Sequence, residues 1–218
     1  MTKKLVIWLL ACLIAPLAAG AAAADKSDFQ AGVDYKLIRP AQPTDDNHIQ
    51  VIEMFWYGCP HCHHFIPYVD KWLKTKPSNV DFELMPAVLR PSWEVHARFF
   101  YAAKALDLLD KLHLKLFDAI HDQKRRLFTE QTLLDFVAEQ GVDRKQFAAA
   151  MHSFAVNLKV RRAMQMGRRF GVDGTPALIV DGKYRVEPGM NGAGFTRILQ
   201  VVNYLVNKEE QHRSVASR

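Results

Sequence analysis

The sequence is poor in cysteine. Among its 218 residues there are three, Cys12, Cys59 and Cys62. Exported proteins that rely on disulfides for stability usually carry several pairs spread over their loops, so this count excludes a disulfide-stapled scaffold. Internal repeats and low-complexity segments are also missing after residue 24, and the 49% hydrophobic composition excludes a disordered or fibrous protein. The length suits one domain of ordinary size with an insertion.

A strong excess of one charge is missing too. The chain has 29 basic and 23 acidic residues, a formal net charge of +6. Two basic residues, Lys3 and Lys4, lie within the first 24 residues, so the remainder has 27 basic residues and a net charge of +4. This small, dispersed excess argues against a nucleic-acid partner, and we interpret the basic run at residues 124–126 as a solvated helix end.

The first 24 residues have the layout of a secretory signal peptide. A short basic start at Lys3 and Lys4 is followed by a mainly apolar stretch, Leu5–Leu17, and by small residues at Ala18–Ala24. We predict cleavage before Asp25 and export of the mature chain. An uncleaved membrane anchor is the alternative, because the apolar stretch is long and uncharged, but its alanine-rich second half favours cleavage.

A strand–helix–strand pattern opens the mature chain. β-Branched and aromatic residues predict strands at His48–Tyr57 and Val80–Val88. Between them, apolar residues at helical spacing predict a helix over residues 60–74, kinked at Pro67. Such a unit implies two parallel strands. A polar N-terminal arm with a short strand-like stretch at Tyr35–Ile38 precedes it.

A helical block follows. From about Pro91 to Gly171 the hydrophobic periodicity is helical almost throughout. Thr129 is a typical helix start and Gly141 a typical helix stop. Apolar stripes predict helices at Trp93–Leu108, Leu109–Gln123, Glu130–Gln140 and Asp143–Phe170.

Strands return near the end of the chain. Ala177–Asp181 and Lys183–Glu187 predict a hairpin around the turn signal Asp181-Gly182. Residues Asn191–Asn207 carry the apolar face of a closing helix, and the charged tail from Lys208 is expected to fray. The whole order predicts an α/β fold, with a mixed central sheet flanked by helices and an inserted helical block.

The stretch FWYGCPHC, residues 55–62, places Cys59 and Cys62 at the start of the predicted first helix. A disulfide across so short a loop stabilises a fold weakly, so this pair is a better candidate for redox chemistry. Zinc binding with His63 or His64 is the alternative, but no second ligand pair occurs at a usable spacing. We therefore expect no metal ligands and interpret both histidines as helix-surface residues.

These residues resemble the redox motif of thioredoxin-like proteins, in which C-x-x-C opens a helix after a strand with aromatic residues. The segment GTPALIVDG, with Thr175 and Pro176, is similar to the cis-proline loop of that fold. The dipeptide Pro60-His61, the helical block and the signal peptide extend the resemblance to the DsbA-type thiol:disulfide interchange proteins of the bacterial periplasm. It covers essentially all of the mature chain, and Glu53 matches the family's buried acid.

The resemblance implies a thioredoxin-like domain in two parts, residues 25–90 and 172–218, with a helical insertion at residues 91–171. It also implies a periplasmic monomer that needs no cofactor besides the Cys59–Cys62 disulfide. Its expected partners are reduced, unfolded exported proteins, which it oxidises, and a DsbB-like, quinone-linked membrane oxidase, which restores the disulfide.

The place of Cys59 at a helix start suggests how such a site works. Unpaired backbone N–H groups and the helix dipole favour a thiolate there, and a protonated His61 adds positive charge. We expect a substrate thiolate to attack Cys59, and the less exposed Cys62 to leave. Glu53 is expected to move the proton of Cys62, provided that burial raises the pKa of the Glu53 carboxyl.

The cis-proline loop is the expected substrate side of the site. Pro176 should lie against the disulfide, where the backbone of Thr175 can pair with an extended substrate. Thr175 is also a departure, because many members of the family have Val before the cis-proline, whereas threonine is common in isomerase and reductase relatives. An isomerase or reductase is therefore the nearest alternative. A non-catalytic chaperone or adaptor that uses exposed aromatic residues such as Trp56 is the second.

Overall fold

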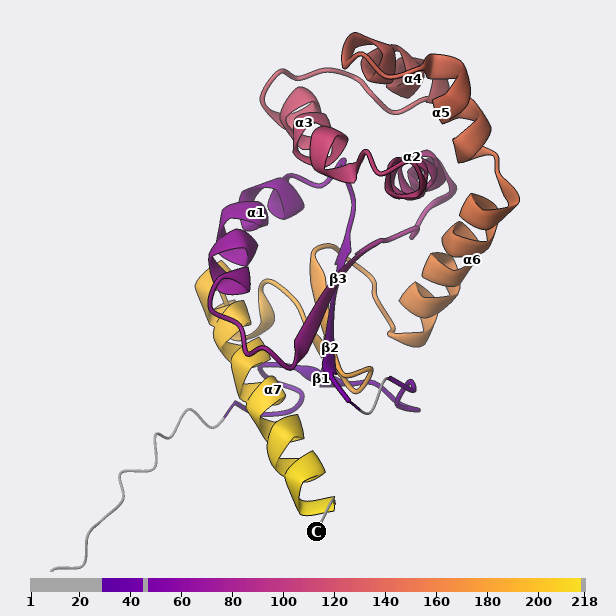
Figure 1. The fold of residues 1–218 in the computed structure, drawn as a ribbon. Coiled ribbons are helices and arrows are strands. Elements are labelled where there is room, and N and C mark those ends of the chain that lie inside the picture. Colours follow the sequence, from indigo (N-terminus) through magenta and orange to yellow (C-terminus); the bar gives the residue numbers. More distant parts are fainter. Residues whose placement is uncertain (1–28, 45–46, 217–218) are drawn as a thin grey trace, which may run out of the picture.

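Figure 1 shows the protein, a computed structural model that describes residues 29–44 and 47–216. The predicted signal peptide, residues 1–24, lies outside these ranges and stays a prediction. Within them, no helix combines the length and the apolar character that crossing a bilayer requires.

A five-stranded sheet forms the centre of the molecule, in the order β1-β5-β4-β2-β3. β2 and β3 are parallel, as the strand–helix–strand pattern predicts, whereas β4 runs antiparallel to both β2 and β5. The predicted mixed sheet is thus confirmed, and the N-terminal arm supplies β1 as an edge strand. The strands are β1 Lys36–Leu37, β2 Ile49–Phe55, β3 Val80–Pro86, β4 Ala177–Val180 and β5 Tyr184–Val186.

The β4–β5 hairpin turns at the predicted pair of residues. Asp181 and Gly182 have φ values of 51° and 61°, the two left-handed conformations that the tightest hairpin turns need. A side chain at position 182 would collide with the backbone carbonyl of Gln42, so this turn requires glycine.

Helices surround the sheet unevenly. In Figure 1, α1 and α7 lie together on one side of the sheet, α6 lies on the opposite side, and α2 to α5 form a cap at one end. Short 3₁₀ turns occur at Pro91–Trp93 and Met190–Gly192. The helices are α1 Pro60–Leu73, α2 Glu94–Ala105, α3 Leu109–His121, α4 Glu130–Glu139, α5 Arg144–Met151, α6 Phe154–Arg169 and α7 Phe195–Ala216.

The stretch predicted as one helix, Asp143–Phe170, is two helices. α5 ends at Met151 and α6 begins at Phe154, with Ser153 in an extended conformation between them. The Ser153 hydroxyl accepts a hydrogen bond from the backbone N–H of Val156 at 3.2 Å and so caps α6. Because the apolar stripe continues across the break, periodicity alone could not reveal it.

The prediction for the last helix, Asn191–Asn207, was wrong at both ends. Asn191 and Gly192 have left-handed φ values of 48° and 67°, which exclude a continuous helix there, so α7 begins after them. The expected frayed tail from Lys208 is also wrong, because α7 continues to Ala216.

Ion pairs and hydrogen bonds with the hairpin hold the end of α7. Glu209 is buried and accepts hydrogen bonds from Lys183 at 2.5 Å and from the Tyr184 hydroxyl at 2.6 Å. Arg213 donates to the buried Asp181 at 2.7 Å. These partners lie far from α7 in the sequence, so the local polarity of the tail could not predict its order.

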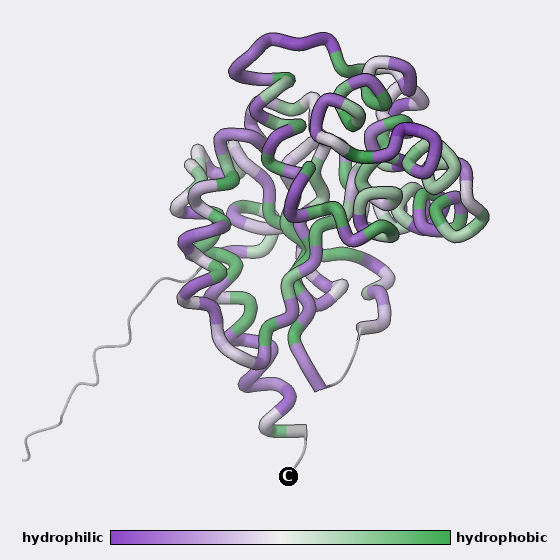
Figure 2. Tube along the Cα trace, turned by 45° about the horizontal axis from the view of Figure 1, so that its top comes forward, coloured by the Kyte–Doolittle hydropathy of each residue, from purple (hydrophilic) through white to green (hydrophobic). Residues whose placement is uncertain are grey.

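Buried apolar residues fill both sides of the sheet. In Figure 2, hydrophobic segments follow the central strands, while hydrophilic segments gather on the outer turns of the helices. On one side, α1 and α7 share a core with the sheet. On the other, Phe55 of β2 packs edge-on against Phe100 of α2, with ring centroids 5.3 Å apart. The helical insertion and the sheet therefore share one core.

Candidate active site

The first helix begins directly after Cys59. This residue has an extended backbone, with φ −92° and ψ 114°, and Pro60 occupies the first helical position, where its missing N–H costs nothing. A side chain at Gly58 would collide with the indole of Trp56, so the tight turn before the helix depends on glycine. The sulfur of Cys59 thus sits at the N-terminus of α1, as the sequence predicts.

The cis-proline loop lies against Cys59. The peptide bond between Thr175 and Pro176 is cis, which confirms that prediction. In its neutral form, the Cys59 thiol donates a hydrogen bond to the Thr175 backbone carbonyl at 3.2 Å. Cys59 is 7% exposed and Cys62 only 1%, so the expected order of exposure holds. Both cysteines are thiols in the structure.

The pKa values of the two thiols are shifted in opposite directions. The pKa of Cys59 is lowered to about 5, mainly because the Cys62 thiol donates a hydrogen bond to its sulfur. Burial opposes this shift, while the Thr175 side chain and the backbone N–H groups of Cys62 and His61 reinforce it. The pKa of Cys62 is raised well above its ordinary value, chiefly by burial and further by the negative charge of Cys59. At neutral pH, one thiolate and one thiol therefore lie side by side.

His61 supports the thiolate through its backbone N–H group. Its side chain is exposed, and the expected effect of a protonated imidazole stays a prediction. His61 lines a hollow of about 400 Å³, together with Thr175, Pro176 and Glu187. This hollow lies at the cis-proline loop, on the side predicted for the substrate.

Glu53 lies beneath the cysteines, in the middle of β2. It is paired in register with Leu84 of β3 and Leu178 of β4, and it is buried, as predicted. Burial raises the pKa of its carboxyl to about 8, and the negative charges of Asp70 and Cys59 add to the shift. The carboxyl is therefore mostly protonated at neutral pH.

A small cavity connects Glu53 with the surface. Its volume is about 90 Å³, and its lining includes Glu53, Ile66, Leu84 and the exposed Asp70 of α1. This space is sufficient for water, and the two carboxyls supply polar partners. A proton held by Glu53 can exchange with solvent along this route.

The family of the chain follows from a comparison with known proteins. Residues 50–205 match the DSBA-like thioredoxin domain. The matched range includes both cysteines, the cis-proline loop and the helical insertion. The chain belongs to this family.

Individual DsbA proteins resemble the chain along most of its length. The thiol:disulfide interchange protein DsbA of Burkholderia cepacia is 37% identical over 97% of this chain and 99% of that protein. The protein of the same name from Pseudomonas aeruginosa is 35% identical over 86% of this chain and 89% of its own length.

Solved DsbA structures confirm the fold. The crystal structure of Pseudomonas aeruginosa DsbA aligns with a TM-score of 0.80 at 32% identity, over 88% of this chain and 99% of that one. The oxidoreductase DsbA from Xylella fastidiosa aligns with a TM-score of 0.76 at 30% identity, over 84% and 98%. The predicted thioredoxin-like fold and the predicted family resemblance are both correct.

The aromatic residues before the DsbA-type motif have different surroundings. Phe55 and Tyr57 are buried and belong to the core. Trp56 is partly exposed and stacks on Trp93 of the insertion, with ring centroids 4.0 Å apart and planes 4° from parallel. Trp56 lies three residues before Cys59 in the sequence, so part of the aromatic surface borders the active site.

Residues of the insertion that sequence reasoning missed help to position this DsbA motif. His121 donates a hydrogen bond to the Tyr57 carbonyl at 2.8 Å, and another hydrogen bond of 2.8 Å joins His113 to the Tyr57 hydroxyl. Asp70, which raises the pKa of Glu53, was also missed. Each partner is separated from its contact by many residues, and no local pattern marks such pairs.

Proposed function

We propose that this protein is a thiol:disulfide oxidoreductase that donates its Cys59–Cys62 disulfide to newly exported proteins, through a mixed disulfide at Cys59. The family and the relatives named thiol:disulfide interchange protein support the redox class. The observation that carries the direction of transfer is the contrast between the lowered pKa of Cys59 and the raised pKa of Cys62.

The first step forms the mixed disulfide. A substrate thiolate attacks the Cys59 sulfur, a substrate–Cys59 bond forms, and the Cys59–Cys62 bond breaks with its electron pair on Cys62. Because Cys62 is buried and its pKa is raised, its thiolate needs a proton. Glu53, with a pKa of about 8, holds that proton at neutral pH and can deliver it.

The second step releases the oxidised substrate. A second substrate thiolate attacks the substrate sulfur of the mixed disulfide, which forms the substrate disulfide and expels Cys59 as a thiolate. The low pKa of Cys59, about 5, makes it a good leaving group. Two electrons pass from two substrate thiols to the Cys59–Cys62 pair.

The stabilised thiolate also makes the protein an oxidant. Any contact that favours the reduced form makes its disulfide easier to reduce. DsbA proteins are themselves a standard example of a thiol pKa lowered at a helix N-terminus. The redox group is the disulfide itself, so this chemistry needs no further cofactor.

The setting of the reaction is part of the same proposal. An extended substrate strand pairs with the backbone of Thr175 beside Pro176 and occupies the hollow lined by His61. A DsbB-like, quinone-linked membrane oxidase accepts the two electrons and restores the disulfide. The mature protein acts as a monomer in the periplasm after loss of its signal peptide.

An isomerase or reductase is the second candidate. Thr175 favours it, because threonine before the cis-proline is common in those relatives. A chaperone or adaptor without redox activity is the remaining alternative, supported by the exposed edge of Trp56.

Two active-site variants test the proposal. Cys59→Ser removes the attacked sulfur, so catalysed oxidation of a reduced, unfolded protein should disappear, whereas Cys62→Ser should accumulate the mixed disulfide. Oxidation that persists in C59S contradicts the proposal. If the wild type binds unfolded chains without oxidising them, and C59S binds them equally well, the chaperone function is supported. A reduction potential near that of thioredoxin, about −270 mV, supports the reductase.

A further inference from the structure

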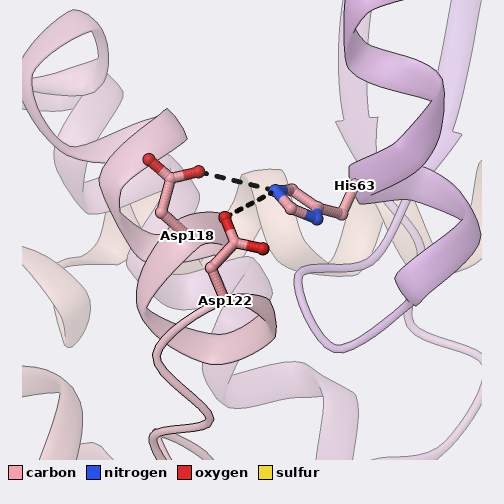
Figure 3. Close-up of side chains that lie close together, drawn as sticks. All are labelled: His63, Asp118 and Asp122. Atoms are coloured by element: carbon pink, nitrogen blue, oxygen red, sulfur yellow. Dashed lines mark ion pairs between the residues drawn. The ribbon is translucent and has the colours of Figure 1, made fainter.

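A histidine and two aspartates converge where α1 faces α3. His63 belongs to α1, Asp118 lies in the last turn of α3, and Asp122 caps that helix. In Figure 3, both carboxylates point toward the same imidazole edge. The His63 Nε2 atom lies 3.4 Å from Asp118 Oδ1 and 3.7 Å from Asp122 Oδ2.

The spacing of these three atoms suits a metal ion. One nitrogen and one oxygen from each carboxylate all lie within 4.8 Å of one another. In a tetrahedral zinc site with bonds of about 2.1 Å, neighbouring ligand atoms are about 3.4 Å apart. Because Asp118 and Asp122 are four residues apart, they share one face of α3, and His63 approaches that face from a second helix. Small side-chain rotations would bring all three ligand atoms to bonding distance from one metal ion.

The charge of the cluster is unbalanced. Within residues 29–44 and 47–216, neither carboxylate has an ion-pair partner other than His63. Two negative charges therefore face one imidazole. The nearby Lys124 forms no ion pair among these residues either, and it acts on His121 rather than joining the cluster. A divalent cation would balance both carboxylates at once.

The cluster is accessible and its histidine is held in place. The side chains of Asp118 and Asp122 are 53% and 64% exposed, so an ion can enter from solvent. The His63 side chain is 17% exposed. Its ring stacks on His121 at 5.1 Å and on Phe117 at 6.0 Å. The ring is therefore ordered before any ligand arrives, which lowers the entropic cost of binding.

His121 supports this site without being one of its ligands. Its Nε2 atom donates to the Tyr57 carbonyl, which fixes the ring beneath His63. The cysteines are not part of the cluster either, so a metal here does not compete with the disulfide.

We propose that His63, Asp118 and Asp122 bind a divalent transition-metal ion of the zinc class, which bridges α1 and α3. The inference goes beyond disulfide exchange and does not depend on it. It replaces our expectation of a chain without metal ligands. The two aspartates lie more than fifty residues from His63 in the sequence, so the CPHCHH stretch alone could not indicate them.

Metal binding is best measured on the oxidised, untagged full protein after treatment with a chelator. Oxidation removes the Cys59 and Cys62 thiolates, which would otherwise bind zinc. Titration with Zn²⁺ should show a single saturable site, and Co²⁺ should give the visible absorption of a low-symmetry complex. H63Q should weaken binding by at least about tenfold. H64Q, which removes the exposed neighbouring histidine, should leave binding unchanged.

The aspartates provide a second, independent test. D118N and D122N keep the shape of each side chain but remove its charge, so each should also weaken Zn²⁺ binding. Near-ultraviolet circular dichroism checks that each variant is folded. If H63Q does not fold, the D118N/D122N double variant is used in its place to test the loss of Zn²⁺ binding. No saturable binding below millimolar Zn²⁺, or equal binding by the wild type and the variants, overturns the proposal.

Discussion

The negative charge of Cys59 depends on contacts from two separate parts of the chain. Cys62 and the backbone N–H groups of α1 are local, whereas Thr175 comes from the loop after α6. Hydrogen bonds to a charged group contribute about 1.5–3 kcal/mol. Thr175 can therefore set the acidity of the reactive thiol as well as contact the substrate.

Thr175→Val tests this contribution. Valine keeps the shape of threonine and removes the hydroxyl, so the pKa of Cys59 should rise by about one unit. Titration of the thiolate absorbance of the reduced protein in the ultraviolet measures the change. Thr196→Val, an exposed position on α7, is the matched control and should not move the pKa. An unchanged pKa in T175V would mean that α1 alone stabilises the thiolate.

Glu53→Gln tests the delivery of a proton to Cys62. The carboxyl loses its proton as the pH rises through about 8, whereas an amide does not titrate. In single-turnover reactions with a small thiol, the wild type should react faster than E53Q at pH 6, by at least about tenfold. The ratio of the two rates should approach one above pH 8. Because both proteins react with the same substrate thiol, its titration affects both rates equally and cancels in this ratio.

Glu83→Gln is the control for this experiment. Glu83 lies on the neighbouring strand β3, paired with Ile52 next to Glu53, and is partly exposed. Its replacement should leave the pH dependence unchanged. If E53Q and E83Q behave alike, the proton of Cys62 comes from another source.

Sequence reasoning predicts the residues of this site better than their surroundings. The CPHC motif indicated the position of Cys59 at the start of α1, and the resemblance of the GTP segment to the family's cis-proline loop indicated the cis bond at Pro176. The burial of Glu53 was also predicted correctly. The effect of Asp70 was not predicted, because its charge acts on Glu53 across a cavity that both residues line, between a helix and the sheet.

At the scale of helices and strands, hydrophobic periodicity succeeded wherever one face of an element is buried. It predicted α1 and the β4–β5 hairpin within a residue or two. It failed at Ser153, where a side-chain hydrogen bond ends one helix and starts the next within a continuous apolar stripe. It failed again at the end of α7, where ion pairs that join buried carboxylates to partly exposed basic side chains connect the helix to the hairpin and overcome a polar local sequence.

Glu209→Ala tests the anchoring of α7. The change leaves Lys183 without one of its two carboxylate partners and the Tyr184 hydroxyl without its acceptor. The free energy of unfolding should fall by about 2–4 kcal/mol. Urea denaturation of the oxidised protein measures this loss. Gln211→Ala, at an exposed position two residues further along α7, should cost little, and equal losses would mean that the ion pairs do not anchor the helix.

The whole molecule behaves as one unit because the insertion completes the core of the sheet. Trp93 stacks on Trp56, and Phe100 packs on Phe55. The hydrophobic periodicity of residues 91–171 predicted a helical block, but it could not show that the block packs against the strand leading to Cys59. A change at the cysteines should therefore alter the stability of the entire fold.

The two redox forms should differ in stability according to pH. The reduced form contains the Cys59 thiolate, whose pKa of about 5 lies below the ordinary 9.0. A lowered pKa stabilises the folded state fully above the ordinary value, and this contribution is lost as the pH falls through about 5. Cys62, with its raised pKa, stays neutral throughout this range. Glu53 is present in both forms, so its effect largely cancels.

Urea unfolding of both forms between pH 7 and pH 5 measures this difference. The stability of the reduced form relative to the oxidised form should decrease by about 1–2 kcal/mol over that range, after allowance for solvent screening of the partly accessible sulfur. The oxidised form has no thiolate and serves as the reference. A difference that stays constant with pH would mean that the charge on Cys59 does not favour the folded reduced protein, and the physical basis for an oxidising disulfide would be lost.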